Sequence, residues 1–350
     1  DVASLVEAPL RSGALLRRDG LLAFAAREAR LAHAPRLDSG RRAVLGLRVA
    51  MACDAALDPF GAIGVLATAV PSGSEAPDVE AVAALRVEGE LSLFLGLLDR
   101  SAEVQERAAR LASEGGLQAL VSRADRLLGR IAREERRWEK AEDLFLSSAQ
   151  GFAHLGMGRE RCLALADAAE LAIDRRDRKA AASALETIRT TSAMMDGDRS
   201  LTVRVGLAQG QLLVLAGELP SAGRAFEQAL AGLDGLRPGA DSLDLAWCTR
   251  HRRGAWQIQR GAYADALAEL ESADRDLGRL AEALPDPIRR SFLARHAIHQ
   301  ILIELQVAHA ALRRVDRRTS VPAAEREGPI GEIVKERNAL LKFEAIARAL

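Results

Sequence analysis

Aromatic residues are scarce in this chain of 350 residues, in which Phe, Trp and Tyr together make up 3%. Hydrophobic residues nevertheless make up 49%, so Ala and Leu have to supply most of the buried surface. Both are strong helix formers, and small side chains set against large ones suit helices that approach one another closely. The composition therefore favours helices over β-sheet.

Net charge is absent as well. Lys and Arg number 49, and Asp and Glu also number 49, which leaves no overall field to draw the molecule onto nucleic acid or an anionic membrane. The longest weakly polar run, Ala62 to Val70, is far shorter than the roughly 20 residues of a membrane helix. We expect no membrane partner, and any charged partner would need a local patch.

Cysteine is rare too, because Cys53, Cys162 and Cys248 are the only three, and they lie far apart. The odd number excludes a closed disulfide framework, and the paired spacing of zinc sites is missing. No secretory signal peptide is visible. The thiols are therefore expected to be reduced and buried in a cytoplasmic protein.

Proline is missing between Asp78 and Leu219, where apolar residues recur at three- and four-residue spacing. This spacing is the amphipathic helix pattern, and the alternation of a strand is absent. Asp58-Pro59 and Asp286-Pro287 each place a capping side chain before a proline suited to the first helical turn. The sequence predicts an all-α protein with helix starts at both dipeptides.

Four segments repeat one spacing of small and large residues. In each, a Gly or Ala precedes an alanine by twelve residues, and a large apolar residue follows that alanine by four. The alanines are Ala141, Ala181, Ala222 and Ala266, which lie 40, 41 and 44 residues apart. The other repeat positions are Gly129, Trp138 and Phe145, then Ala169, Arg178 and Leu185, then Gly210, Leu219 and Phe226, and finally Gly254, Tyr263 and Leu270.

This spacing resembles the tetratricopeptide repeat, in which small residues let paired antiparallel helices approach and a large residue wedges between them. The resemblance implies an α-solenoid, a right-handed superhelix of antiparallel helix pairs. The spacing exceeds the usual repeat length of about 34 residues, which longer helices would account for. Arg178 and Arg253 depart from the pattern, since the family prefers an aromatic residue and a leucine at these places.

The predicted organisation has five parts. They are irregular N-terminal helices at 1–40, about six repeat pairs at 41–283, a capping helix at 284–314, a loop at 315–329 and the start of a signalling helix at 330–350. The stretch from Leu284 to Leu293 resembles the terminal cap of repeat regions in large bacterial regulators, in which a kinase or an ATPase precedes the repeats and a GAF domain follows. We expect the chain to be part of a longer polypeptide, because it opens without a methionine.

Catalytic motifs are missing from the sequence. It holds no glycine-rich phosphate loop followed by Lys-Ser/Thr, no nucleophile elbow and no metalloprotease His-Glu pattern. His296 and His299 lie three residues apart, but no third ligand lies nearby, which favours a partly buried polar pair over a metal site. We expect no catalytic residue, no metal and no cofactor in this chain.

Two further groups of residues each have two interpretations. The aromatic set comprises Trp138, Trp247, Trp256 and Tyr263. These rings could stack a ligand, but aromatic residues at helical spacing more often form wedges in the core. The basic runs at 250–253 and 313–318 raise a nucleic-acid alternative. Neither run lies in a recognition fold, and the neutral overall charge argues against nucleic acid.

Four arginines share one face of a single predicted helix. They are Arg123, Arg126, Arg130 and Arg133, at intervals of three, four and three residues, and we call them the arginine stripe. In the tetratricopeptide family the corresponding face lines a concave groove, so the resemblance makes the stripe, together with Arg204 and His251, a candidate partner-binding surface. Guanidinium groups in a groove suit carboxylates or phosphates. The alternative is a solvated stripe balanced by acidic residues of the neighbouring helix.

The leading functional hypothesis is a non-catalytic interaction scaffold of a bacterial signalling protein. It would bind a protein or peptide, including an acidic one, or a domain of the same polypeptide, and would relay the outcome through its terminal helix. The rival hypothesis is an inhibitory or regulatory arm of a kinase or ATPase encoded in flanking sequence. A nucleic-acid or small-ligand binder is less favoured. The sequence leaves the oligomeric state open.

Overall fold

The computed structural model describes residues 39–70, 79–192 and 198–319, and over these ranges it holds fourteen helices and no strand. The helices are α3 (Ser39–Ala55), α4 (Pro59–Ala69), α5 (Val79–Phe94), α6 (Leu98–Glu114), α7 (Gln118–Glu134), α8 (Trp138–His154), α9 (Gly158–Asp174), α10 (Arg178–Ser192), α11 (Arg199–Ala216), α12 (Leu219–Gly232), α13 (Ala240–Gln259), α14 (Tyr263–Ala283), α15 (Asp286–Leu293) and α16 (His296–Thr319). None of them has the length and apolar character needed to cross a membrane. Most of the predicted N-terminal part and all of the signalling helix lie outside the described residues.

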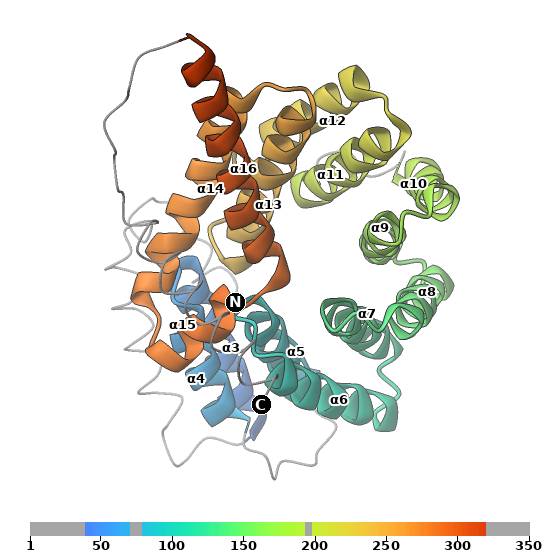
Figure 1. The fold of residues 1–350 in the computed structure, drawn as a ribbon. Helices are drawn as coiled ribbons and strands as arrows, with labels where there is room; N and C mark the ends of the chain where they lie inside the picture. Colours follow the sequence, from blue (N-terminus) through green and yellow to red (C-terminus); the bar gives the residue numbers. More distant parts are fainter. Residues whose placement is uncertain (1–38, 71–78, 193–197, 320–350) are drawn as a thin grey trace, which may run out of the picture. The chain divides into compact units, whose positions relative to one another are not determined.

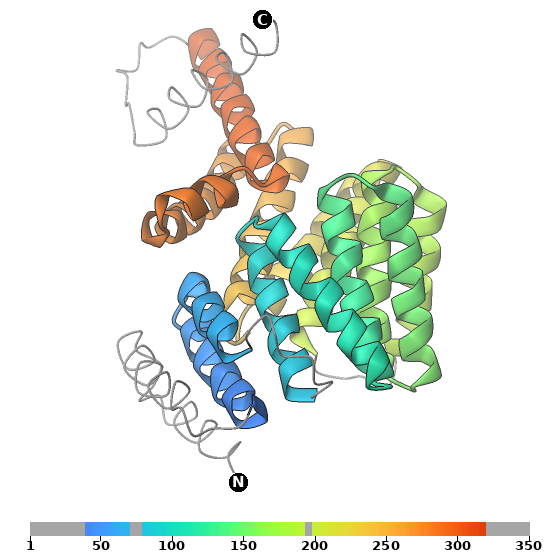
Figure 2. The same ribbon diagram turned by 90° about the horizontal axis from the view of Figure 1, so that it is seen from below.

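Consecutive helices pack as hairpins. The pairs are α3 with α4, α5 with α6, α7 with α8, α9 with α10, α11 with α12 and α13 with α14. Figure 1 shows these pairs following one another, and Figure 2 shows the helices of the green middle pairs running nearly parallel to a common direction. The all-α fold class, an α-solenoid of antiparallel helix pairs, is confirmed.

The turns of the middle pairs explain the long repeat. α6, α7, α8 and α9 each have 17 residues, and a residue with positive φ follows each of them, at positions 116, 136, 156 and 176, twenty residues apart. These turns have the hydrogen bonds of the Schellman motif, as where Leu117 N–H donates to Ala112 O at 2.8 Å. A helix with its turn therefore takes twenty residues, and a pair takes forty.

Arg176 occupies one of these left-handed positions, at φ 60°, although a side chain with L configuration is strained there by roughly 1 kcal/mol. Its side chain is exposed, so Arg176→Gly should raise the free energy of unfolding by about 0.5 kcal/mol, after allowance for the greater freedom of glycine in the unfolded chain. Chemical denaturation measures the difference. The control is Gly156→Ala, at φ 68° with open space around the new Cβ atom, which should destabilise. A loss of stability in Arg176→Gly would contradict this account of the turn.

The repeat positions lie where the two helices of a pair cross. A Cβ atom added to Gly129 would lie 2.7 Å from the ring of Phe145, and one added to Gly210 would lie 2.5 Å from the ring of Phe226. Glycine is required at these crossings because interiors are packed too densely to give way by a whole methyl group. The repeat alanines are all fully buried; they are Ala141, Ala181, Ala222 and Ala266.

The structure also shows where the residues that depart from the repeat pattern and the aromatic residues lie. Arg253, where the family has leucine, forms an ion pair with Glu269 across the α13–α14 hairpin. The ring centroids of Trp256 and Phe226 are 6.1 Å apart and the rings are tilted. This contact joins the α11–α12 pair to the α13–α14 pair. Trp247 is fully buried. Partly buried or exposed residues begin three of the second helices; they are Trp138, Arg178 and Tyr263.

The region after the repeats differs from the prediction of one capping helix at 284–314. α15 ends at Leu293 and α16 begins only at His296, and α16 continues through residues 315–319, which the sequence assigns to a loop. The chain breaks at Arg295 because the guanidinium of this residue turns inward and donates to Phe94 O at 3.0 Å. Leu284 and Phe292 on either side of α15 are both buried.

Only one of the two predicted proline-containing caps has the expected geometry. Asp58 caps α4, because its carboxylate accepts from Gly61 N–H at 2.9 Å. Asp286 does not cap α15; it is the first residue of that helix, and Pro285 occupies the cap position without a side-chain bond. The Asp286 carboxylate instead forms an ion pair with Arg289 one turn later.

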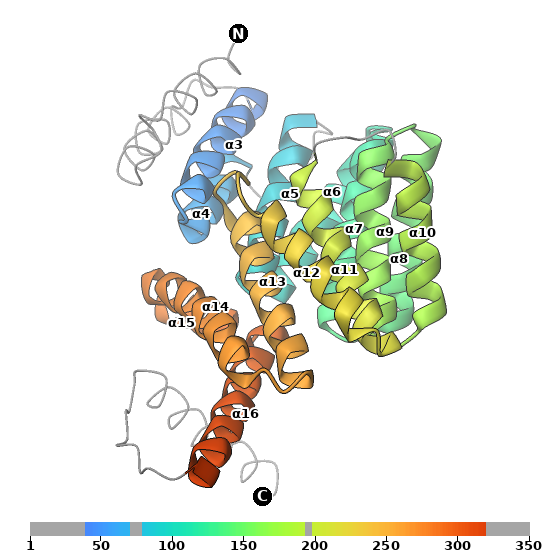
Figure 3. The same cartoon turned by 90° about the horizontal axis from the view of Figure 1, so that it is seen from above.

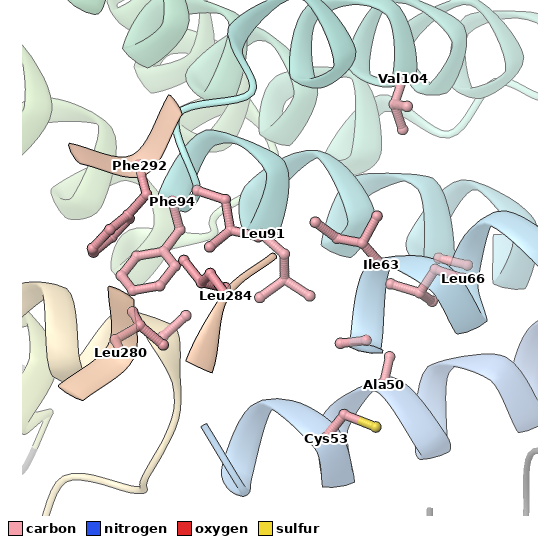
Figure 4. Packing of buried hydrophobic residues seen from close by; sticks show 14 of the residues in the cluster. Ala50, Cys53, Ile63, Leu66, Leu91, Phe94, Val104, Leu280, Leu284 and Phe292 are labelled. Carbon is pink, nitrogen blue, oxygen red and sulfur yellow. The ribbon is translucent and has the colours of Figure 1, made fainter. Parts of the chain in front are cut away.

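One hydrophobic core joins the start of the array to its end. Phe94 of α5 and Phe292 of α15 have ring centroids 5.8 Å apart, and Figure 4 shows them beside Leu280 and Leu284. The same cluster contains Trp247 of α13 and residues of α3, α4 and α6. Figure 3 shows the blue α3–α4 pair beside the start of α13. The array therefore turns back on itself, and the first helices of five pairs face a common centre.

Candidate functional site

The inner helices enclose a pocket of about 410 Å³, which we call the central pocket. α5, α7, α9, α11 and α13 supply most of its wall, and Figure 1 shows these helices around one centre. α3 adds Asp54, and the α15–α16 turn adds Arg295. The volume falls within the range of roughly 300–1,000 Å³ that is typical of ligand pockets.

Charged side chains of both signs line the central pocket. The seven arginines are Arg86, Arg123, Arg126, Arg130, Arg159, Arg204 and Arg295, and the five acids are Asp54, Glu90, Glu160, Asp241 and Asp244. Apolar side chains complete the wall, among them Leu127, Leu163 and Phe94. The mixture suits a ligand that has both polar charged groups and apolar surface.

Ion pairs connect α7 to α9, the first helix of the following repeat. Arg123 on α7 donates to Glu160 on α9 at 3.2 Å, over 37 residues of sequence, and Arg126 donates to Asp167 at 2.5 Å, over 41 residues. These separations bracket the forty-residue period of the pairs. An arginine therefore meets an acid of the following repeat, and the acids of α9 balance most of the arginine stripe.

Asp167 is the most buried of these acids, with 2% exposure. Burial alone would raise its pKa, but the guanidinium groups of Arg126, Arg130 and Arg204 hold the pKa below its usual value. For Arg204 burial acts against the charged form, yet the nearby Asp241 carboxylate, with other acids, raises its pKa. Arginines of α7 and α11, the helices on either side of α9, therefore both interact with the Asp167 carboxylate.

Asp54 belongs to a different part of the wall. Its carboxylate accepts from Ala240 N–H at 2.8 Å, which links the first pair to the first residue of α13. Burial is the main cause that raises the pKa of Asp54, to about 6, and the neighbouring Asp241 and Glu90 add to the shift.

Four of the six candidate binding residues line the central pocket; they are Arg123, Arg126, Arg130 and Arg204. Arg133 lies outside the pocket lining, with Glu170 at 2.6 Å and Asp174 at 2.7 Å. His251 does not line the pocket either. It is buried at 2% exposure on α13 with Nε2 3.0 Å from Glu304 of α16, and burial lowers its pKa. Its helix turns this face away from the inner wall because α16 packs there.

Sequence reasoning missed several residues of the pocket. Arg295 and Asp54 reach it only because the array turns back on itself, over separations of 201 residues to Phe94 and 186 residues to Ala240. No local pattern marks such contacts. The spacing could have revealed the acids of α9 and α13. Each of them follows an arginine of the preceding unit by one repeat period, to within one helical turn.

The described part of the chain has no feature of a metal site or a reactive thiol. It contains no group of three His, Cys, Asp or Glu side chains that could hold a metal ion. Cys53 is buried, and burial, with Asp58 and Asp54 nearby, raises the pKa of its thiol to about 11. Burial also raises the pKa values of Cys162 and Cys248, although Cys248 is only partly buried and so differs from the expectation. These thiols stay protonated at neutral pH and act as small apolar groups.

The fold is similar to those of several solved structures, among them the two that follow. The apo form of RapI shares 12% identity with a TM-score of 0.62, over 78% of this chain and 96% of that chain. BtubC (BKLC) from P. vanneervenii shares 20% identity with a TM-score of 0.50, over 63% of this chain and 94% of that chain. No protein-family model matches the chain, and no curated protein does. At such identities the likeness concerns the fold, which is a tetratricopeptide-like α-solenoid.

Proposed function

We propose that this chain is a non-catalytic interaction scaffold whose central pocket binds a short segment of a peptide or protein. The observation that carries the proposal is the central pocket itself, to which the inner helices of five successive pairs contribute charged and apolar side chains. A peptide has backbone donors and acceptors, charged groups of both signs and apolar side chains. A wall with charged groups of both signs and apolar side chains can bind it with specificity.

The kind of protein that contains this scaffold is proposed from the sequence resemblance. The segment from Leu284 to Leu293 is similar to the cap of repeat regions in large bacterial regulators, so we propose that the scaffold serves a signalling protein of that kind. A kinase or ATPase before it and a GAF domain after it would be the parts that it connects. Sequencing the flanking gene tests this directly, because either domain has recognisable motifs.

A bulky side chain in the central pocket should weaken peptide binding. Ser200 lines the pocket at the start of α11, so Ser200→Trp places an indole where the ligand would lie. Thr202, two residues on, is exposed and outside the pocket lining, and Thr202→Trp is the matched control. Peptides selected from a random displayed library on the wild-type chain should bind Ser200→Trp at least about tenfold more weakly. Equal binding to both variants would place the recognition surface elsewhere.

A further inference from the structure

Arg130 differs from the other arginines of the central pocket in how it is paired. Among the contacts of the described residues, the other six each donate a hydrogen bond to an acid, as Arg126 does to Asp167 at 2.5 Å. Arg130 donates none. Its nearest carboxylate oxygen is Asp244 Oδ2, 3.8 Å from Nη2, which is an ion pair beyond hydrogen-bond distance. The side chain is 25% exposed and lines the pocket.

Asp244 is held 3.8 Å from Arg130 because it also pairs with Arg295. Its other oxygen, Oδ1, accepts from Arg295 at 3.1 Å, and Arg295 also donates to Phe94 O at 3.0 Å. The Arg295 guanidinium lies 5.7 Å from the Phe94 ring centroid and 5.5 Å from that of Trp247, and its side chain is 9% exposed. Asp244 is therefore fixed by a buried arginine, and Arg130 keeps donors for another acceptor.

The charges around Arg130 limit what that acceptor can be. Five acids line the same pocket beside the seven arginines, and each of the other six arginines already donates to an acid. The one guanidinium that stays available therefore matches the single charge of a carboxylate better than the two charges of a phosphate dianion, which the acids would also repel more strongly. A peptide carboxylate carries one negative charge and two acceptor oxygens, which fit the two parallel donors of a guanidinium.

We propose that Arg130 is the anchor of the central pocket, and that it binds a carboxylate group of the peptide ligand while Asp244 acts as an internal competitor for the same guanidinium. This inference rests on the proposed function and adds a ligand class to it. It assigns the arginines of the stripe different roles. Arg126 belongs to the buried network of Asp167, and Arg130 is available to the ligand.

The test compares four chains in the same selection of a random seven-residue peptide library: wild type, Arg130→Gln, Asp244→Asn and Ser200→Trp. The peptides retained by the wild type should be enriched in Asp and Glu. Calorimetry with the most frequent acidic peptide, and with its Glu→Gln or Asp→Asn counterpart, then measures affinity. Arg130→Gln should bind the acidic peptide about tenfold more weakly, with no preference over the neutral counterpart.

Asp244→Asn separates the proposal from a purely structural effect. The asparagine oxygen can still accept from Arg295, while the competing charge is removed, so the acidic peptide should bind more tightly than to the wild type. The double variant should bind as weakly as Arg130→Gln alone. The melting temperature of Arg130→Gln should change far less than that of Arg126→Gln, because Arg130 makes no hydrogen bond in the described structure.

The outcomes distinguish the two proposals. If the wild type selects no peptide, or if Ser200→Trp binds as well as wild type, the proposed function fails and the inference fails with it. If peptides are selected but Arg130→Gln binds them with unchanged affinity, or if Asp244→Asn lowers the affinity, the proposed function stands and the role of Arg130 is wrong. Displacement of the acidic peptide by millimolar inorganic phosphate from wild type, but not from Arg130→Gln, would replace the carboxylate by phosphate as ligand class.

Discussion

Replacing Asp167 with alanine should destabilise the protein by about 4 kcal/mol. Asp167 is 2% exposed and accepts a hydrogen bond of 2.5 Å from Arg126. Arg130 and Arg204 also act on its charge. Without the carboxylate, positive groups from α7 and α11 would face one another across α9 in a buried region, and a buried charge without a partner is far more costly than the loss of one hydrogen bond.

Chemical denaturation of the wild type and of Asp167→Ala measures this difference, and the control is Asp174→Ala on the same helix. Asp174 is also paired with an arginine of the stripe, but Arg133 keeps Glu170 at 2.6 Å when Asp174 is removed. The control should lose less than about 1 kcal/mol. Similar losses for both variants would show that Asp167 has no special role between α7 and α11.

The effect of Asp167 should also depend on pH. The folded state holds the pKa of the Asp167 carboxyl below its usual value, so its contribution to stability is present above the unfolded pKa and is lost as the pH falls through the folded pKa. The difference between wild type and Asp167→Ala should therefore be constant from pH 7 to pH 5 and should shrink below about pH 4. A difference that grows on acidification would contradict the pairing.

The helix pairs could be predicted from the sequence because their cause is local. Gly129 and Phe145 are sixteen residues apart, and this spacing brings them together across one hairpin whenever both helices and the turn keep their lengths. The seventeen-residue helices and the short Schellman turns do keep them. Each repeat then packs on its neighbour by nearest-neighbour contacts alone.

The central pocket could be predicted only in part, because its closure depends on contacts that no local pattern encodes. The arginine stripe was visible from its spacing, and the structure places three of its four members in the pocket. Arg295 and Asp54 enter the wall through packing of the first pairs against α13 and α15. Small changes of angle between successive repeats accumulate along a solenoid, so the sequence of one repeat does not specify where the last one lies.

The arginine stripe has features of both alternatives that its spacing allows, a binding groove and a stripe balanced by acids. Arg126 and Arg133 have close acidic partners on α9, as the balanced alternative expects. Arg130 lines the pocket with only a long ion pair to Asp244. Four arginines on one face of one helix therefore have different surroundings, because the neighbouring helices place an acid within hydrogen-bond distance of some of them and not of others.

Replacing Gly210 with leucine should destabilise the protein by about 3 kcal/mol, because even a Cβ atom at this position would lie 2.5 Å from the ring of Phe226. Phe226→Ala should destabilise by about 4 kcal/mol through the cavity that it leaves, since the ring is 1% exposed. The double variant should lose about 2 kcal/mol less than the sum of the single losses, because the leucine occupies part of the space of the missing ring.

Denaturation of the two single variants and the double variant measures this coupling, and two controls make it specific. Gly278→Leu introduces the same side chain into the interior of α14, where a Cβ atom meets nothing within 4 Å, so it should be neutral or slightly stabilising. Gly210→Leu combined with Leu270→Ala, whose side chain packs in the next hairpin against Gly254, should show additive losses. If the Gly210–Phe226 pair were also additive, the two residues would not share one crossing, and the spacing of sixteen residues would no longer explain how the helices of a repeat fit together.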